Sequence, residues 1–335
     1  MALKIAINGF GRIGRLVYRA ILENDDKDIN VVCINDLGPP NSNAHLLKFD
    51  TIHGILPHNV EVEGDYILVD HRPVKVTAEK DPLKLPWEEL GVDIALECTG
   101  LFTSKIAASA HLNAGAKKVL ISAPASEADI TVVYGVNSDK LTPDHRIVSN
   151  ASCTTNCLAP VAHVLHGAMG IERGFMTTIH SFTGDQRTVD TLHGDLHRAR
   201  TASVSMIPTS TGAARAVGLV LPELEGKLDG TSIRVPTPNV SVIDFKFVPT
   251  KATDIDSVND AIKDASEGKL KGILSTNELP LVSVDFNHNP HSSIFDLAET
   301  QVIESQFVRV MSWYDNEWGF SNRMIDTAKA MGNLL

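Results

Sequence analysis

The sequence is short of cysteine, of positive charge and of long apolar runs, and each shortage excludes a class of protein. Its 335 residues include only four cysteines, too few for a disulfide scaffold, which predicts a reducing, cytoplasmic setting. The net charge of −11 argues against a dedicated nucleic-acid-binding protein. No apolar run approaches the roughly 20 residues of a membrane-spanning helix. The N-terminus also lacks the pattern of a signal peptide.

What the chain does contain is typical of a globular protein with a sizeable core. Hydrophobic residues make up 43% of the sequence and charged residues 21%. A length of 335 residues favours two domains. We predict a first domain over residues 1–152, completed by a C-terminal helix over 317–335, and a second domain over 153–316.

The first motif is a glycine-rich turn between a strand and a helix. Residues 4–8 form an apolar strand pattern that leads into the G-x-G-x-x-G of Gly9, Gly11 and Gly14. A helix follows on an apolar face of period 3.6. In a dinucleotide-binding unit Gly9 permits the tight turn, Gly11 lets the backbone approach the pyrophosphate, and Gly14 lets the helix pack on the strand.

An acidic residue completes the motif. A second strand over 30–34 ends at Asp36, which lies 22 positions beyond Gly14 (36 − 14). Its carboxylate would accept hydrogen bonds from the adenosine ribose and repel a 2′-phosphate, so NAD is favoured over NADP. The alternative is a structural glycine turn beside a solvated acid.

The remaining strand patterns of the first half predict an α/β sheet of the Rossmann type. Residues 60–76 alternate around a glycine and predict hairpins, while a helix is expected over 104–113. Thr99 and Ser122 follow predicted strands, at the carboxyl ends where ligands bind in open α/β sheets. The parallel sheet is expected to continue through strands over 93–97, 119–122 and 132–134.

The second half has longer strand patterns and fewer helical crossovers. This predicts an α+β domain with a mostly antiparallel sheet. A polar stretch over 181–212 has little periodicity, and a loop of that length is usually functional or part of an interface. Strands are predicted over 175–180, 232–247, 281–287 and 308–314, and helices over 158–169, 256–265 and 322–335.

A cysteine near the middle of the chain is the candidate nucleophile. Cys153 lies between a strand pattern and a helical pattern, within residues that cap helices. At a helix start the unpaired N–H groups and the dipole favour an anion, so the thiol is expected to ionise more easily. The alternative is a buried structural cysteine, which is the usual state of a free thiol.

A cysteine nucleophile needs a base, and His180 is the candidate. It lies 27 positions beyond Cys153 (180 − 153), at the end of a predicted strand. His193, His197 and the pair His288/His291 are rivals, and that pair lacks further ligands at a familiar metal-site spacing. Cys157, one helical turn from Cys153, is interpreted as a packed neighbour or a resolving thiol. We therefore predict no metal site.

A nicotinamide domain joined to a reactive cysteine predicts oxidation of an aldehyde through a thioester, with water or phosphate as the acyl acceptor. The polar stretch and the strand after it supply hydroxyls and cations that could hold oxyanions. By composition alone they could equally form a solvated loop that makes subunit contacts. These candidates are Thr183, Asp185, Arg187, Arg198, Thr211, Gly212 and Arg234.

Three stretches resemble one known family across essentially the whole chain. I-N-G-F-G-R-I-G-R (7–15), A-S-C-T-T-N-C-L-A-P (151–160) and W-Y-D-N-E-W-G-F-S-N-R-M (313–324) are similar to phosphorylating glyceraldehyde-3-phosphate dehydrogenases. The resemblance implies oxidation of glyceraldehyde 3-phosphate to 1,3-bisphosphoglycerate, with NAD and inorganic phosphate, by a homotetramer. It also implies that residues 181–212 line the cofactor site of the neighbouring subunit.

The resemblance further implies a role for individual residues. Cys153 would be the nucleophile and His180 its activating partner. The attacking phosphate would be bound by Ser152, Thr154, Thr211, Gly212 and Arg234. The substrate's own phosphate would be bound by Thr183 and Arg234, with Asp185 beside them, holding Arg198. NAD contacts would come from Arg12, Ile13, Asp36, Lys80 and Ser122, while Asn316 would orient the nicotinamide carboxamide.

The sequence departs from the family pattern at three positions. Phe320 stands where a tyrosine is frequent, Leu192 where many members have proline, and Lys80 where arginine is common. Asp36 remains, so the preference for NAD is expected to survive. The closest alternative is the sister enzyme erythrose-4-phosphate dehydrogenase, which uses water as the acceptor. A non-catalytic binding protein on the same fold is a third reading, which the intact Cys153, His180 and Arg234 disfavour.

Overall fold

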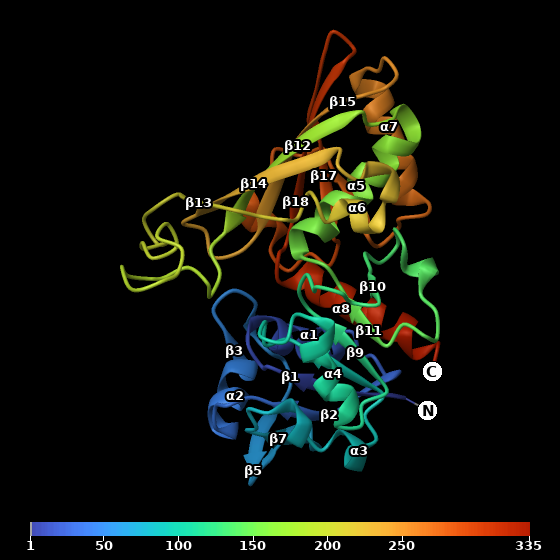
Figure 1. Cartoon of the computed structure of the whole chain (residues 1–335). Helices are drawn as coiled ribbons and strands as arrows, with labels where there is room; N and C mark the ends of the chain where they lie inside the picture. Colours follow the sequence, from blue (N-terminus) through green and yellow to red (C-terminus); the bar gives the residue numbers. More distant parts are fainter. Residues whose placement is uncertain (1) are drawn as a thin grey trace. The chain divides into compact units, whose positions relative to one another are not determined.

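The computed structural model describes residues 2–335, and the chain divides into two compact units (Figure 1). The first comprises the described residues up to Val132, together with Ser138–Ala151 and Ser321–Leu335. The second comprises Val133–Asn137 and Ser152–Phe320. Each unit is built around a sheet of its own. No helix within residues 2–335 is long and apolar enough to cross a bilayer.

The first unit holds a nine-stranded sheet in the order β10-β11-β9-β8-β1-β2-β7-β6-β5. Strand β1 lies between β8 and β2 and is parallel to both, so the strand order reverses beside it. Ligands bind at such a reversal, outside the carboxyl ends of the strands. The strands are β1 (Leu3–Asn8), β2 (Ile29–Asn35), β5 (Val60–Glu63), β6 (Tyr66–Val69), β7 (Arg72–Thr77), β8 (Ile94–Glu97), β9 (Lys118–Ile121), β10 (Ile130–Thr131) and β11 (Ile147–Ser149).

Apolar side chains explain why this sheet is buried. Strands β8 and β9 are buried at every position, as expected for parallel strands covered on both faces. The predicted hairpins are confirmed, because β5, β6 and β7 pair antiparallel, and β7 then pairs with β2. The helices are α1 (Arg12–Glu23), α2 (Pro40–Lys48), α3 (Trp87–Leu90), α4 (Lys105–Asn113) and most of α8 (Trp318–Gly332), with short pieces β3 (Phe49–Asp50), β4 (Gly54–Ile55), η1 (Pro82–Lys84) and η2 (Ser138–Lys140).

The second unit holds a seven-stranded sheet in the order β13-β14-β12-β15-β18-β17-β16. Four of its six strand pairs are antiparallel, which confirms a mostly antiparallel sheet. The strands are β12 (Arg173–Ser181), β13 (Ile207–Thr209), β14 (Leu228–Val235), β15 (Ser241–Val248), β16 (Leu274–Asn277), β17 (Ser293–Ile303) and β18 (Phe307–Tyr314). The helices are α5 (Cys153–Met169), α6 (Val217–Val220), η3 (Pro222–Leu224), α7 (Ile255–Glu267) and η4 (Ser283–Phe286).

Three strand predictions are wrong. The run 281–287 alternates like a strand, but the Asp285 carboxylate accepts a hydrogen bond from the Val282 N–H and closes a 3₁₀ turn. The actual strands of this region, β16 and β17, show no comparable alternation of apolar and polar residues.

The run 132–134 is a turn, in which the Asn137 side-chain oxygen accepts a hydrogen bond from the Val133 N–H.

The third error concerns the predicted strand over 232–247, which is divided between β14 and β15. Pro236 and Pro238 lie between the two strands, and proline has no N–H to donate to a ladder. A single continuous strand is therefore not possible across this stretch.

Candidate active site

Helix α5 begins at Cys153, as the sequence predicts. Ser152 is the N-cap, and its hydroxyl accepts a hydrogen bond of 3.0 Å from the Thr155 N–H. This bond uses one of the N–H groups that a helix start leaves unpaired. The backbone N–H groups of Cys153 and Thr154, at the positive end of the helix dipole, face the Cys153 sulfur and favour its thiolate.

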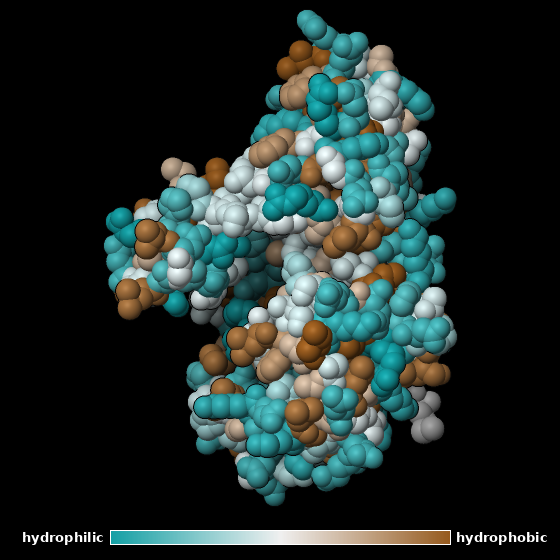
Figure 2. All heavy atoms as spheres, in the orientation of Figure 1, coloured by the Kyte–Doolittle hydropathy of each residue, from teal (hydrophilic) through white to brown (hydrophobic). Residues whose placement is uncertain are grey.

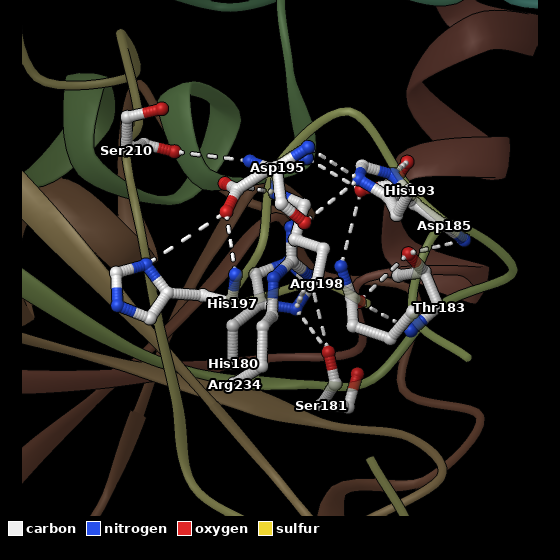
Figure 3. Close-up of polar contacts among 11 residues, drawn as sticks. His180, Ser181, Thr183, Asp185, His193, Asp195, His197, Arg198, Ser210 and Arg234 are labelled. Carbon is white, nitrogen blue, oxygen red and sulfur yellow. Dashed lines mark hydrogen bonds and ion pairs between the residues drawn. The ribbon is translucent and has the colours of Figure 1, made fainter. Parts of the chain in front are cut away.

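His180 meets Cys153 from the end of β12. Its Nε2 lies 3.5 Å from the Cys153 sulfur, and the residue is 3% exposed. Strands β12 and β14 are parallel, and His180 and Arg234 occupy paired positions in their register. The His180 Nδ1 lies 2.7 Å from the carbonyl oxygen of Ser181 and 2.5 Å from Nη1 of Arg234 (Figure 3). A thiol, an imidazole and a guanidinium therefore share one buried site.

The burial of this site decides which forms of the thiol and the imidazole are stable. Burial raises the pKa of the Cys153 thiol, and Arg234 only partly opposes this effect. Burial and the nearby charge of Arg234 together lower the pKa of His180 to about 3. The sequence-based expectation of an easily ionised thiol is therefore wrong for this state, because burial outweighs the helix start. Both partners are neutral near pH 7.

The sequence predicts no role at this site for Tyr314, yet its hydroxyl connects two of the elements that carry the site. It is hydrogen-bonded to Thr154 at 2.9 Å and to Thr178 at 2.8 Å, and its ring lies edge-on to His180 at 5.9 Å. Tyr314 ends β18, so it couples α5 and β12 through side chains far apart in sequence. No local pattern could have indicated this contact.

A polar cluster lies on the segment that follows β12 (Figure 3). Asp185 forms an ion pair with Arg198, as the sequence predicts, and also contacts His193 Nε2 at 3.4 Å. The Thr183 N–H and hydroxyl both donate to the side-chain oxygen of Gln186, at 3.0 and 3.2 Å. The Asp185 pKa is lowered, because hydrogen bonds from Arg198 and His193 outweigh the effect of burial. The cluster therefore holds one arginine and one threonine in defined orientations.

The segment after β13 lies against the start of α5. The Thr155 hydroxyl donates to the Ala213 carbonyl at 3.2 Å, and the Thr211 hydroxyl accepts from the Ala213 N–H at 3.2 Å. Thr211 and Gly212 are thereby brought next to the helix start that carries Ser152 and Thr154. Among the buried polar atoms, Nε of Arg234 has no partner within the described residues, so this guanidinium retains a donor for an anion.

Asn316 has a side chain of fixed orientation. Its Oδ1 accepts hydrogen bonds from the hydroxyls of Ser181, at 2.8 Å, and Ser241, at 2.9 Å. Two hydroxyl donors on the oxygen leave the Nδ2 amide as the donor that Asn316 can offer elsewhere.

The rival histidines are engaged differently. His193 pairs with Asp185, His197 lies 3.7 Å from Asp195, and the His288 ring stacks on Trp318 at 3.7 Å. Within residues 2–335, His180 is the histidine hydrogen-bonded to Cys153.

In the first unit, the glycine motif forms a tight cradle at the carboxyl end of β1. Gly9 has φ +91°, and a Cβ there would lie 2.7 Å from the Thr99 nitrogen. A Cβ on Gly14 would lie 2.2 Å from the Gly9 carbonyl oxygen, whereas Gly11 faces open space. Helix α1 starts directly after Gly11, at Arg12. This is the geometry that lets backbone approach a pyrophosphate at a helix N-terminus.

A pocket of about 470 Å³ lies beside the cradle, and its size and lining suit an adenosine moiety. Asp36 lines the pocket, and its carboxylate accepts from the N–H groups of Phe10, at 2.8 Å, and Gly38, at 3.0 Å. Lys80 and Thr99 also line it, while Ser122 follows β9, and its N–H donates to the Glu97 carbonyl.

Two further predicted cofactor residues belong to the first turn of α1. The Arg12 side chain forms an ion pair with Asp50, whose own pKa is lowered, because hydrogen bonds from Arg12 and from backbone N–H groups outweigh burial. Ile13 follows at the second position of the helix and is half-buried. The charge of Arg12 is therefore already compensated at the edge of the cradle.

Comparisons with known proteins agree over both units. The model of the glyceraldehyde 3-phosphate dehydrogenase NAD binding domain matches residues 3–105, and the model of the C-terminal domain of that enzyme matches residues 152–316. A glyceraldehyde-3-phosphate dehydrogenase of Xanthobacter flavus is 67% identical over 334 residues, covering 100% of both chains. Enzymes of the same name from Cereibacter sphaeroides and Geobacillus stearothermophilus are 62% and 56% identical, covering 100% and 98% of both chains.

Proposed function

The chain belongs to the glyceraldehyde-3-phosphate dehydrogenase family and uses NAD, and we propose that Cys153, His180 and Arg234 carry its reaction. The reaction is the oxidation of glyceraldehyde 3-phosphate with transfer of the acyl group to inorganic phosphate. The observation that carries the assignment of residues is the contact of 3.5 Å between the Cys153 sulfur and His180 Nε2, beside Arg234.

His180 is suited to act as a base because it is neutral. With a pKa of about 3, the ring is neutral near pH 7. Its proton on Nδ1, donated to the Ser181 carbonyl, leaves Nε2 able to accept a proton. The Cys153 sulfur adds to the aldehyde carbon, and the thiol proton moves through Nε2 to the new hydroxyl of the hemithioacetal. Nε2 then takes that hydroxyl proton as the carbon is oxidised to a thioester. NAD, when held by the first unit, would supply the acceptor for the hydride that leaves this carbon.

The acyl transfer to phosphate also uses Cys153 and His180, and the proton now moves from the imidazole to the sulfur. Phosphate oxygen attacks the thioester carbon, the carbon–sulfur bond breaks, and His180 returns its proton to the leaving sulfur. Cys153 is the first residue of helix α5, and the N–H groups of the helix start favour an anion at this position. We assign the attacking phosphate to Ser152, Thr154, Thr211, Gly212 and Arg234.

Arg234 couples anion binding to proton transfer. Its charge, 2.5 Å from His180 Nδ1, disfavours a protonated imidazole. A phosphate dianion bound at the unpartnered Nε of Arg234 would compensate the arginine's charge. The pKa of His180 would then rise, so that Nε2 could hold the proton taken from the hemithioacetal hydroxyl. We assign the substrate's phosphate to Arg234 and Thr183, with Asp185 positioning Arg198 beside them.

The NAD contacts are assigned to the cradle and the pocket of the first unit. They comprise Gly9, Gly11, Arg12, Ile13, Gly14, Asp36, Lys80, Thr99 and Ser122. Asn316 is assigned to the nicotinamide carboxamide, because the hydroxyls of Ser181 and Ser241 leave its amide nitrogen as a donor. The domain division is proposed as 1–152 with 317–335 for the cofactor and 153–316 for catalysis.

We propose a cytoplasmic homotetramer. All four cysteines are free thiols, which suits a reducing compartment. The segment between β12 and β13 exposes Leu192 by 92%, Leu196 by 82% and Val204 by 77%. Figure 2 shows hydrophobic side chains among hydrophilic ones on this segment, at the left of the view. Such exposure is typical of a protein interface.

The decisive experiment measures NADH formation from glyceraldehyde 3-phosphate, with and without inorganic phosphate, and with erythrose 4-phosphate as a competing substrate. A strict phosphate requirement and preference for the triose are expected. Phosphate-independent turnover that favours the tetrose would remove the assignments of Thr211 and Gly212. The roles of Cys153 and His180 would stand in either case.

A further inference from the structure

A group of polar residues, all buried except Thr99, lies at the wall of the NAD pocket, and Thr99 is the one member to which a role is assigned above. The Glu97 cluster consists of Asn8, Asn35, Trp87, Glu97, Thr99 and His111. Glu97 is 1% exposed and His111 is fully buried. Within residues 2–335, no lysine or arginine forms an ion pair with Glu97, so its charge is balanced by hydrogen bonds and not by a cation.

The hydrogen bonds of this cluster have one possible direction. An indole N–H can only donate, so the bond of 3.0 Å from Trp87 Nε1 makes His111 Nδ1 an acceptor. The ring proton of His111 must then lie on Nε2, which donates to Glu97 Oε2 over 2.9 Å. Trp87 therefore selects the tautomer of His111, and His111 in turn requires an acceptor at position 97.

Glu97 accepts from three further donors. The Asn8 amide donates to Oε2 over 2.6 Å, and the Thr99 N–H donates to Oε1 over 2.8 Å. The Thr99 hydroxyl also donates to Oε1 and itself accepts from the Leu101 N–H at 3.0 Å. Both oxygens are acceptors only, which matches a carboxylate and no other common side chain of this size.

The chain of bonds continues across the sheet. Because the amide of Asn8 donates to Glu97, its oxygen accepts from Asn35 at 2.7 Å. The amide of Asn35 also donates to the Glu79 carbonyl at 2.8 Å, and its oxygen accepts from the Glu79 N–H at 2.9 Å. One directional network thus connects the carboxyl ends of β8, β1 and β2 to the segment that carries Lys80.

The walls of the NAD pocket are attached to this network. Asn8, Asn35 and Thr99 line the pocket themselves. The Thr99 nitrogen packs against Gly9 so closely that a Cβ on the glycine would lie 2.7 Å from it. Phe102, another lining residue, places its ring edge-on to His111 at 6.2 Å. Glu97 is therefore hydrogen-bonded directly to two residues that line this pocket, Asn8 and Thr99.

We propose that Glu97 is a positioning residue for NAD, and that His111 and Trp87 maintain the bond direction on which it depends. The proposal rests on the placement of the adenosine in this pocket, which is itself part of the proposed function. Glu97 orients Thr99 and Asn8, and through them the Gly9 turn, before the cofactor arrives. Binding then requires less ordering of the protein.

The test is Glu97→Gln, which preserves size and replaces one acceptor oxygen by a donor. The new amide N–H groups at position 97 then face other donors, because every partner of Glu97 donates to it. We expect the Kd for NAD, measured by calorimetry on the full chain, to rise roughly 10- to 50-fold. The kcat at saturating NAD should stay within about threefold, because the thiol site is unchanged. A residue that only stabilises the fold would lower Tm and leave the Kd unchanged.

The matched control is Asp93→Asn, immediately before the opposite end of the same strand. Asp93 accepts from the Lys4 N–H at 2.8 Å and from Lys117 Nζ at 2.7 Å, so the variant loses comparable bonds away from the pocket. Its Kd for NAD should match the wild type. An unchanged Kd in Glu97→Gln, or an equal rise in both variants, would overturn the proposal.

Two further variants separate the possible failures. Asp36→Asn tests the placement of the adenosine: if it weakens NAD binding while Glu97→Gln does not, only the positioning role falls. If neither variant weakens binding, the pocket assignment falls with it. Should Glu97→Gln not fold, Trp87→Phe decides, because it removes the donor that selects the His111 tautomer and leaves Glu97 itself unchanged. A Kd raised about threefold supports the proposal, and an unchanged Kd refutes it.

Discussion

Two histidines are buried in the described part of the chain, one in each compact unit, and their neighbours give them different properties. His111 has Trp87 on one ring nitrogen and Glu97 on the other, both at normal hydrogen-bond distances. His180 has a thiol at 3.5 Å on Nε2, and a carbonyl and a guanidinium beside Nδ1. The first ring is locked in one tautomer, whereas the second can exchange a proton with sulfur. Burial alone therefore does not distinguish the proposed positioning histidine from the proposed catalytic one.

The same substitution at both histidines should separate these roles most strongly. His180→Asn removes the proposed base beside Cys153, so kcat is expected to fall about 10²- to 10⁴-fold with the Kd for NAD unchanged. His111→Asn should raise the KM for NAD several-fold and change kcat by less than about threefold. Steady-state kinetics and NAD titration measure both. If the two variants show the same pattern, the distinction between the two histidines is wrong.

The acid stability of the protein should depend on His180. Its pKa in the folded chain, about 3, lies below the ordinary value of 6.5, so the unfolded chain binds the proton more readily. The stabilisation is complete above pH 6.5 and is lost as the pH falls towards 3. The free energy of unfolding, from denaturant titrations, should fall through this window by about 1.4 kcal/mol per unit of pKa shift relative to His180→Asn.

Arg234→Leu provides the control for that measurement. Loss of the neighbouring positive charge raises the pKa of His180 towards its ordinary value, so the pH dependence should become shallower. A slope as steep as that of the wild type would show that Arg234 does not act on His180. The variant should also lose most activity, so stability and not turnover is the informative readout.

Removal of the Tyr314 hydroxyl should have a smaller effect. Tyr314→Phe leaves the hydroxyls of Thr154 and Thr178 without the partner that they share. The expected loss is about 1–3 kcal/mol in the free energy of unfolding, because buried polar groups lose a hydrogen bond. Thr300, whose hydroxyl donates to Asn259 away from the site, offers a matched control as Thr300→Val. Equal stability of wild type and Tyr314→Phe would contradict this role.

The smallest effect is expected at the hydroxyls that orient Asn316. Ser241→Ala removes one of the two donors to its Oδ1, at a cost of about 1 kcal/mol. The KM for NAD should rise about fivefold, while the double variant with Ser181→Ala should exceed the sum of the single effects, because the amide can then rotate. Additive single effects would show that the hydroxyls do not act through Asn316.

Local patterns were sufficient for some elements. The path from β1 through Gly9, Gly11 and Gly14 to α1, and the helix start at Cys153, depend on neighbouring residues and agree with the structure. The run 281–287 was predicted wrongly because Asp285 bonds to a backbone group three residues away, a local choice that alternation does not reveal. Strand β17 was missed because its pairing with β18 decides its conformation.

The sequence by itself determined the two sheet classes, the dinucleotide motif, the cysteine at a helix start and the family. These depend on residue type, spacing and short-range order. Only the tertiary structure decided that His180 lies opposite Arg234, that burial raises the pKa of Cys153, and that Trp87, Glu97 and His111 form one directed network. The reason is physical, because hydrogen-bond direction and desolvation depend on groups that are brought together by strand pairing and packing.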